Sequence, residues 1–165
     1  MLTRRAGAPA PGPGAVINGL SHIGDTGRAR MVDVSAKEAT PRTAAARGTV
    51  TCKPQTLDQV RAGTAPKGAV VQTAELAGVM GAKRTAELIP LCHPLPLTHV
   101  EVRIDIDESV PGFCIHSEVR TKAETGVEME ALTAVAVAGL TLFDMLKAVD
   151  STMVIGGVEV TSKTK

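Results

Sequence analysis

Apolar and charged residues alternate strictly over residues 99–107, HVEVRIDID. The apolar positions are Val100, Val102, Ile104 and Ile106, and the charged positions are Glu101, Arg103, Asp105 and Asp107. Because successive side chains of a strand point to opposite faces, this pattern predicts a β-strand with one buried face. The turn signal SVPG follows at 109–112, and residues 113–121, FCIHSEVRT, predict the returning strand of a hairpin.

A long helix is predicted before this hairpin. It starts near Ala69 and ends at Pro90, because the residue before a proline is disfavoured in the α conformation. Ala74, Gly78 and Ala82 recur at intervals of four on one side of the helix. A glycine in a helix costs about 1 kcal/mol relative to alanine, so we expect another backbone to pack closely against this side.

Shorter segments complete the predicted order of elements. Residues 48–53 and 153–163 predict strands, and residues 56–63 predict one or two helical turns with Thr56 as the N-cap. Residues 21–48 contain several charges without a sustained period, and we interpret them as irregular.

A second long helix is predicted over residues 126–150. The order is then strand, short helix, long helix, strand, strand, long helix, strand, which is a βαββαβ pattern with an extra helical turn. An α+β domain fits it, with a four-stranded antiparallel sheet and helices packed on one face, the ferredoxin-like arrangement. We expect one domain over residues 19–165, preceded by a disordered Pro/Ala/Gly-rich tail over residues 1–18.

The second long helix has no charged residue between Glu130 and Asp144, and apolar side chains surround its axis. A helix that is hydrophobic all round is buried, so we expect a second subunit to cover it, with coverage by the chain's own loops as the alternative. Glu130 and Asp144 lie about 21 Å apart along the axis. They can serve one small site only from different subunits, or by holding opposite ends of a long substrate.

Composition excludes several classes of protein. The net charge is +1, Trp and Tyr are absent, and there are two Phe residues, so binding to nucleic acid by charge or by stacking is not expected. No apolar run of membrane-spanning length and no signal-peptide core are recognised, and no membrane partner is expected. Three distant cysteines indicate a reducing cytoplasm and neither a disulfide framework nor a metal site. No cofactor is expected.

Several long motifs resemble the MoaC family, the cyclic pyranopterin monophosphate synthases of molybdenum cofactor biosynthesis. The similarity runs from about Ser21 to the end of the chain. The motifs are MVDVSAK (31–37), KG (67–68), AGVMGAKRTAELIPLCHPLPL (77–97), TGVEMEALTAVAVAGLTLFDMLKAV (125–149) and SKT (162–164).

The resemblance implies a ferredoxin-like subunit in a homohexamer, built as a trimer of dimers with active sites at the dimer interface. It also implies a reaction that converts 3′,8-cyclo-7,8-dihydro-GTP into cyclic pyranopterin monophosphate and releases pyrophosphate. This makes the chain a phosphorus–oxygen lyase. A MoaA-type radical SAM enzyme would supply the substrate from GTP, and molybdopterin synthase would use the product.

The resemblance also implies roles for particular residues. Lys67, Asp144 and Lys147 match the family's catalytic residues. Leu91, Cys92, His93, Met129 and Glu130 match its substrate-binding residues, and Glu128 and Arg42 are expected near the site. The chain departs from the family at Ala69, where aspartate is common, and at Lys165, which occupies the place of the first glycine of a glycine-rich basic tail.

The chemistry of such a substrate suits these residue types. Lysines at fixed positions can neutralise a triphosphate and the charge that develops as pyrophosphate leaves. Lys67 and Lys147 suit this role, as do Lys83 and Arg84 unless these two belong to a solvated helix surface. A carboxylate and an amine within hydrogen-bond reach can transfer protons, and Asp144 with Lys67 is the first choice.

Two questions stay open. His93 lies between Cys92 and Pro94 in the stretch LIPLCHPLPL, and it either only binds the substrate, also donates a proton, or packs in the core. The second question concerns the whole chain. A ferredoxin-like nucleotide-binding or regulatory module without catalysis is the alternative function, since this fold has many functions.

Overall fold

The computed structural model describes residues 22–23 and 27–165. The predicted disordered tail, residues 1–18, lies outside this part of the chain. Two compact units are distinguished, Met1–Asp33 and Val34–Lys165. In the first, an isolated antiparallel bridge joins Ile23 to Ala29. The second contains all of the helices and strands of the described residues.

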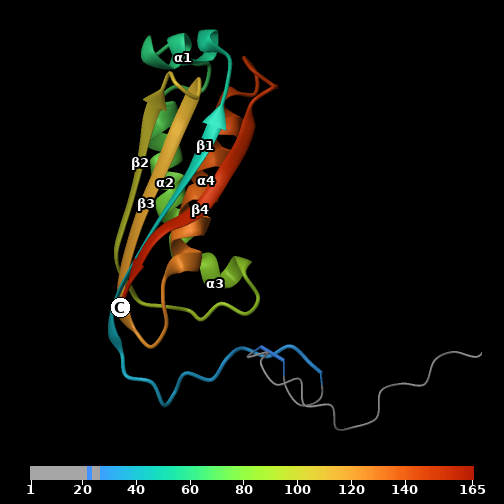
Figure 1. Cartoon of the computed structure of the whole chain (residues 1–165). Coiled ribbons are helices and arrows are strands. Elements are labelled where there is room, and N and C mark those ends of the chain that lie inside the picture. The colour runs from blue at the N-terminus through green and yellow to red at the C-terminus, as the bar shows by residue number, and fades with distance from the viewer. Residues whose placement is uncertain (1–21, 24–26) are drawn as a thin grey trace, which may run out of the picture. The chain divides into compact units, whose positions relative to one another are not determined.

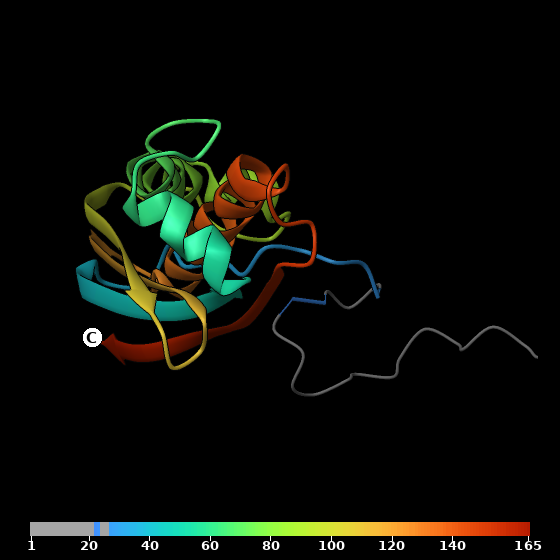
Figure 2. The ribbon, with the colours of Figure 1, turned by 90° about the horizontal axis from the view of Figure 1, so that it is seen from above.

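Four strands and four helices form the second unit. They are β1 (Thr40–Thr51), α1 (Pro54–Arg61), α2 (Val70–Lys83), α3 (Thr85–Leu88), β2 (Leu97–Asp107), β3 (Gly112–Ala123), α4 (Glu128–Leu146) and β4 (Val154–Thr164). The strand order is β2-β3-β1-β4, and every neighbouring pair is antiparallel. The helices lie on one face of the sheet (Figures 1 and 2). The predicted α+β, ferredoxin-like arrangement is confirmed, and so is the predicted hairpin.

The first strand begins much earlier than the sequence indicated. Residues 21–48 were interpreted as irregular, but β1 starts at Thr40 and pairs with β3 on one side and with β4 on the other. Its helix-facing positions include Ala44 and Ala46, which are fully buried. Alanine and threonine differ little in hydrophobicity, so the alternation of buried and exposed positions gives almost no signal in the sequence.

The prediction of one continuous helix from Ala69 to Pro90 is wrong in its last third. The helix α2 ends at Lys83, and Arg84 leaves the α conformation with φ −112° and ψ 12°. The short α3 then begins at Thr85, whose Oγ1 donates a hydrogen bond of 2.9 Å to the carbonyl oxygen of Ala82. This side-chain bond competes with the backbone of the turn, and the chain changes direction there.

The prediction of Thr56 as an N-cap is also wrong. Lys53 occupies the cap position of α1, and Pro54 is the first helical residue, a place that suits its fixed φ and missing N–H. Thr56 is buried inside the helix, and its Oγ1 donates to Oδ2 of Asp150, 3.2 Å away.

The helices α2 and α4 pack closely, as the small residues predicted. Ala74, Gly78 and Ala82 are all buried on α2. A Cβ atom added at Gly78 would lie 2.9 Å from the carbonyl oxygen of Ala134, and one added at Gly81 would lie 2.8 Å from Cγ2 of Val137. Glycine therefore lets the backbone of α4 approach at Gly78, and at Gly81 it leaves room for the side chain of Val137.

The helix α4 is the core of the unit. Its 19 residues are long and apolar enough to cross a membrane by length and composition, so the expectation that no apolar run has membrane-spanning length is wrong. Ten of its residues are buried against the sheet and α2, which is typical of the core helix of a globular domain. Leu140 on α4 is nevertheless 61% exposed, so the chain does not cover the helix by itself. Coverage by a second subunit stays a prediction.

Candidate active site

A lysine–aspartate–lysine cluster lies at the end of the unit where α4 terminates. Nζ of Lys67 lies 2.6 Å from Oδ2 of Asp144, and Nζ of Lys147 lies 2.7 Å from Oδ1 of the same carboxylate. Lys67 also donates to the backbone carbonyl oxygen of Asp144 at 2.9 Å. The three side chains are 43–54% exposed, so the cluster is open to a ligand.

Local backbone geometry explains how residues 77 positions apart in sequence meet. Asp144 lies in the last turn of α4, and Lys147 follows the helix three residues later on the same side. Lys67 belongs to the turn before α2, where Gly68 has a φ of 80° and donates a backbone hydrogen bond to Ala65. A residue with a side chain would be strained at that φ, which gives the glycine of the KG motif a structural role.

The two lysines of the cluster stabilise the ionised form of Asp144. Hydrogen bonds from Lys147 and Lys67, reinforced by their positive charges, lower the pKa of the Asp144 carboxyl from 3.8 to about 2. The group is therefore ionised at neutral pH and is a weak base. Its geometry suits it to hold two ammonium groups in place, whereas the sequence suggested that Asp144 itself transfers protons.

A second group of polar residues lies at the opposite end of α4. Sγ of Cys92, in the loop after α3, donates to Oε1 of Glu130 across 3.6 Å. Glu130 is only 3% exposed, and its Oε2 has no hydrogen-bond partner among the described residues. Burial raises the pKa of the Glu130 carboxyl. Burial and the neighbouring Glu130 raise the pKa of the Cys92 thiol to about 11, so this cysteine is not a nucleophile at neutral pH.

A pocket of about 150 Å³ opens beside Glu130. Lys83 at the end of α2 and Thr85 at the start of α3 line it together with Leu95 and Leu97. Lys83, proposed from the sequence as a phosphate ligand, thus lies near the buried carboxylate, whereas Arg84 does not line this pocket. His93 is half-buried in the loop beside Cys92.

A basic pocket of about 320 Å³ lies near the start of α4. It is lined by Arg42, Thr43, Gly126, Glu128, Lys163, Thr164 and Lys165. Nζ of Lys163 lies 3.2 Å from Oε1 of Glu128. Arg42 donates to the carbonyl oxygen of Glu124 at 3.3 Å, and its Nε is buried without a partner in the described part of the chain. Lys163 and Lys165 had no assigned role in the sequence, although the SKT motif was a signal for the first.

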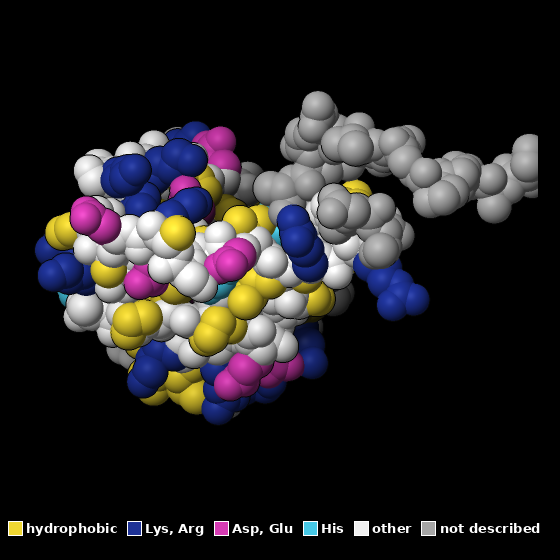
Figure 3. Space-filling view, turned by 90° about the horizontal axis from the view of Figure 1, so that it is seen from below, with side chains coloured by type: hydrophobic (Ala, Val, Ile, Leu, Met, Phe, Trp, Pro, Cys, Tyr) yellow, Lys and Arg dark blue, Asp and Glu magenta, His cyan; other side chains and the backbone are white. Residues whose placement is uncertain are grey.

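The predicted site residues therefore lie in two separate groups at opposite ends of α4, which we call the two half-sites of the predicted active site. Leu91, Cys92, His93, Met129, Glu130, Glu128 and Arg42 belong to the end at which α3 lies, and Figure 3 shows basic, acidic and apolar side chains close together on that end. Lys67, Asp144 and Lys147 belong to the other end, where α4 terminates; Figure 1 shows that this end of α4 lies far from α3. The fourteen residues from Glu130 to Asp144 span about 21 Å of helix.

Metal ligands are not clustered in the described residues. No group of three or more His, Cys, Asp or Glu side chains there is arranged to hold a metal ion. The polar groups of both half-sites are instead lysine, arginine, carboxylate and thiol groups, which suit an anionic organic ligand.

The fold and the half-sites define an α+β protein of the ferredoxin-like class with a lysine–carboxylate centre. Residues 31–165 match the MoaC family, and the chain belongs to that family. A relative from Nostoc sp. is 55% identical over 145 residues, which are 88% of this chain and 86% of the relative. Relatives from Roseiflexus castenholzii and Cereibacter sphaeroides are each 53% identical, over 88% and 89% of this chain and 92% of their own length. All three are named cyclic pyranopterin monophosphate synthase.

Proposed function

We propose that this chain is a cyclic pyranopterin monophosphate synthase, a phosphorus–oxygen lyase of molybdenum cofactor biosynthesis. Its reaction converts 3′,8-cyclo-7,8-dihydro-GTP into cyclic pyranopterin monophosphate and releases pyrophosphate. The observation that carries the proposal is the lysine–aspartate–lysine cluster, in a chain more than half identical to relatives of that name. A protein that only held nucleotides would not need an exposed carboxylate shared by two lysines.

The half-site beside α3 suits the substrate's polar groups. Arg42, Lys163 and Lys165 supply positive charge in one pocket, which supports binding of phosphate groups there. The unpartnered Oε2 of Glu130 can accept hydrogen bonds from the N–H groups of a guanine-derived ring. The LCH loop, Leu91 to His93, borders this position and completes the binding residues together with Met129 and Glu128.

The cluster at the other end suits the chemical steps. When the cyclic phosphate forms, a substrate hydroxyl oxygen attacks the α-phosphorus, its proton is removed, and the bond to pyrophosphate breaks with the electron pair leaving on pyrophosphate. Positive groups fixed near the departing oxygen stabilise this charge. We assign this stabilisation to Lys67 and Lys147, and we assign their positioning to Asp144. One of the two ammonium groups donates a proton to the departing pyrophosphate oxygen and, once neutral, takes up the proton of the attacking hydroxyl.

A second subunit would bring the half-sites together. Because one rigid helix separates them by about 21 Å, a single chain cannot close both around one small ligand. We propose a cytoplasmic homohexamer, built as a trimer of dimers, in which each active site combines the cluster of one chain with the binding residues of another. A MoaA-type radical SAM enzyme supplies the substrate, and molybdopterin synthase uses the product.

Phosphorus NMR tests this function with the cyclised GTP intermediate as substrate. The wild-type protein is expected to release pyrophosphate and to form a cyclic phosphate signal. Asp144→Asn is expected to bind the substrate but to form no product, whereas the control Glu159→Gln, in an exposed ion pair on β4, keeps wild-type turnover. Substrate binding without any pyrophosphate release by the wild-type protein would instead support the non-catalytic module.

A further inference from the structure

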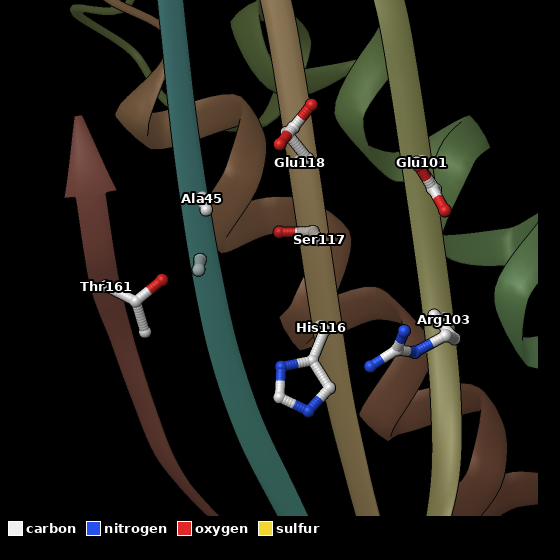
Figure 4. A pocket seen from close by; sticks show the side chains of 8 residues that line it. Ala45, Glu101, Arg103, His116, Ser117, Glu118 and Thr161 are labelled. Atoms are coloured by element: carbon white, nitrogen blue, oxygen red, sulfur yellow. The ribbon is translucent and has the colours of Figure 1, made fainter. Parts of the chain in front are cut away.

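Two carboxylates of the described residues are buried, those of Glu130 and Asp150. Glu130 belongs to the predicted substrate-binding residues, whereas the proposed reaction gives Asp150 no role. By contrast, Figure 4 shows charged side chains on the face of the sheet away from the helices, where Glu101 and Arg103 are exposed. A charged side chain is rarely buried unless it is paired or hydrogen-bonded, so the position of Asp150 needs an explanation.

The carboxylate of Asp150 holds two segments of the chain. Asp150 lies in the loop between α4 and β4, and its Oδ1 accepts hydrogen bonds from the N–H and the hydroxyl of Thr152 at 2.9 and 2.7 Å. Its Oδ2 accepts hydrogen bonds from the backbone N–H of Lys53 at 2.8 Å and from the hydroxyl of Thr56 at 3.2 Å. One oxygen thus binds its own loop, and the other binds the start of α1.

The helix α1 obtains its N-terminal cap from Asp150. Its own N-cap residue, Lys53, makes no side-chain cap hydrogen bond, and Pro54 has no N–H to donate. In a capping box, an acidic or amide side chain of the third helical residue accepts the N–H of the N-cap residue. Here the third residue is Thr56, and Asp150 accepts that N–H in its place. A distant segment therefore fixes the start of α1, which lies at the end of the sheet where α4 terminates (Figure 1).

The loop after α1 leads directly to Lys67 of the cluster. This loop is held by its own hydrogen bonds, from the N–H of Thr64 to the carbonyl oxygen of Gln59 and from the N–H of Gly68 to that of Ala65, both 3.0 Å long. Ala65 is also buried. Because the loop is short and internally bonded, a displacement of α1 moves Lys67 as well.

The segment that contains α1 is therefore attached to the end of α4 at two places. Asp150 holds its start, and Asp144 holds its end through Lys67. Lys147 does not depend on these attachments in the same way, since its backbone N–H is bonded to the last turn of α4 itself. Of the two lysines of the cluster, Lys67 is the one whose position depends on α1.

We propose that Asp150 is a positioning residue, which places Lys67 against Asp144 by capping α1. A group that is held in position before the ligand arrives loses less conformational freedom in the reaction. The placement of Lys67 does not depend on which reaction occurs, and only the effect on turnover rests on the proposed function.

The pKa of Asp144 reports the position of Lys67, because the hydrogen bond and the charge of this lysine help to lower it. Asp150→Asn keeps the shape of the side chain but puts an NH₂ group where an acceptor is needed. It is expected to raise the pKa of Asp144 above about 2, by nearly as much as Lys67→Gln does. The loss of a negative charge would by itself lower this pKa, so a rise indicates a displaced lysine. Carboxyl carbon NMR measures it.

Double variants show which lysine is displaced. If Asp150 acts through Lys67, Asp150→Asn raises the pKa of Asp144 no further in the Lys67→Gln variant. The same change adds its full effect to that of Lys147→Gln, because the contact of Lys67 is still present there to be lost.

Thr56→Val and Thr152→Val form a matched pair that keeps Asp150 in place. Each removes one hydroxyl donor from its carboxylate, but only Thr56 belongs to α1. Thr56→Val is expected to raise the pKa of Asp144, and Thr152→Val to leave it unchanged. This pair tests the proposal even if Asp150→Asn does not fold, and thermal unfolding shows which variants are folded.

Turnover of the cyclised GTP intermediate is the second measurement. Asp150→Asn is expected to lower kcat about tenfold and to change KM less than about twofold, because Lys67 acts in the chemical step. A raised pKa of Asp144 with an unchanged kcat would refute the role in turnover.

Three results would overturn the placement of Lys67 by Asp150. They are an unchanged pKa of Asp144 in folded Asp150→Asn or Thr56→Val, equal changes in the two threonine variants, and an additive effect of Asp150→Asn and Lys67→Gln. A wild-type protein that releases no pyrophosphate would overturn the proposed function alone, since the pKa of Asp144 is measured without substrate.

Discussion

At the scale of residues, two carboxylates of one helix have opposite environments. Asp144 is exposed and accepts hydrogen bonds from two lysines, which lower its pKa to about 2. Glu130 is buried, and burial raises its pKa. The first carboxylate therefore anchors positive charge, whereas the second is buried and its Oε2 has no hydrogen-bond partner among the described residues. The positions in the helix, and not the residue types, decide these roles.

A titration of Asp144 by carboxyl carbon NMR is expected to give a pKa near 2. Because this lies below the ordinary value of 3.8, the stabilisation from the ionised group is present above that value and is lost as the pH falls through about 2. Lys147→Gln is expected to raise the pKa of Asp144, and Lys67→Gln to raise it less, since Lys147 is the larger cause.

The pKa of Asp107 serves as the internal control for this titration. Hydrogen bonds from Ser109 lower it, and Asp107 belongs to the hairpin, outside the cluster. It is expected to stay the same in both lysine variants. An Asp144 pKa that neither variant changes would contradict the geometry of the cluster.

At the scale of elements, the strength of the local pattern decided what the sequence could predict. The hairpin of β2 and β3 was predicted because valine and isoleucine alternate with charged residues. Most of β1 was missed, since its buried positions are alanines, and so was the break after Lys83. For the site, the spacing of Asp144 in α4 and Lys147 at its C-cap predicted their contact. The contact of Lys67 with Asp144 joins distant segments, and only the family resemblance grouped these residues.

Asp150, in the loop between α4 and β4, connects this loop to the start of α1. It is 1% exposed, and its carboxylate accepts hydrogen bonds from the backbone N–H of Lys53 and Thr152 at 2.8 and 2.9 Å, and from the hydroxyl groups of Thr56 and Thr152. Burial alone would raise its pKa, but the hydrogen bonds from Thr152 and Lys53 outweigh burial and hold the pKa at about 2.

Asp150→Ala is expected to lower the free energy of unfolding by about 3 kcal/mol at neutral pH, because four donors lose their acceptor in a buried place. Urea unfolding measures this. The contribution of Asp150 is present above its ordinary pKa and is lost as the pH falls through about 2. The control Glu159→Ala breaks an exposed pair with Arg47 and is expected to cost about 0–1 kcal/mol. Equal losses in the two variants would refute the role of Asp150.

At the scale of the whole molecule, the length of α4 sets the distance between the two groups of predicted site residues. Its length keeps the cluster at one end away from Cys92 and Glu130 at the other. Its exposed Leu140, with Leu76 and Met80 on α2, leaves apolar surface uncovered on the helix side of the chain. A second copy that covered this surface in the opposite direction would bring the cluster of one chain to the predicted substrate-binding residues of the other.

Complementation between two inactive variants tests this account most directly. Lys67→Ala removes a lysine of the cluster, and Glu130→Gln alters the other half-site without changing the size of the side chain. The two chains are co-expressed with different tags, purified as mixed assemblies and supplied with the cyclised GTP intermediate, and pyrophosphate release is measured. Each variant alone is expected to be inactive.

In the mixed assemblies, sites that combine the intact half of each chain make up about a quarter of all sites when the chains associate at random. Pyrophosphate release at about a quarter of the wild-type rate is therefore the predicted result. Mixed assemblies that form but stay as inactive as the separate variants would contradict a site shared between two chains.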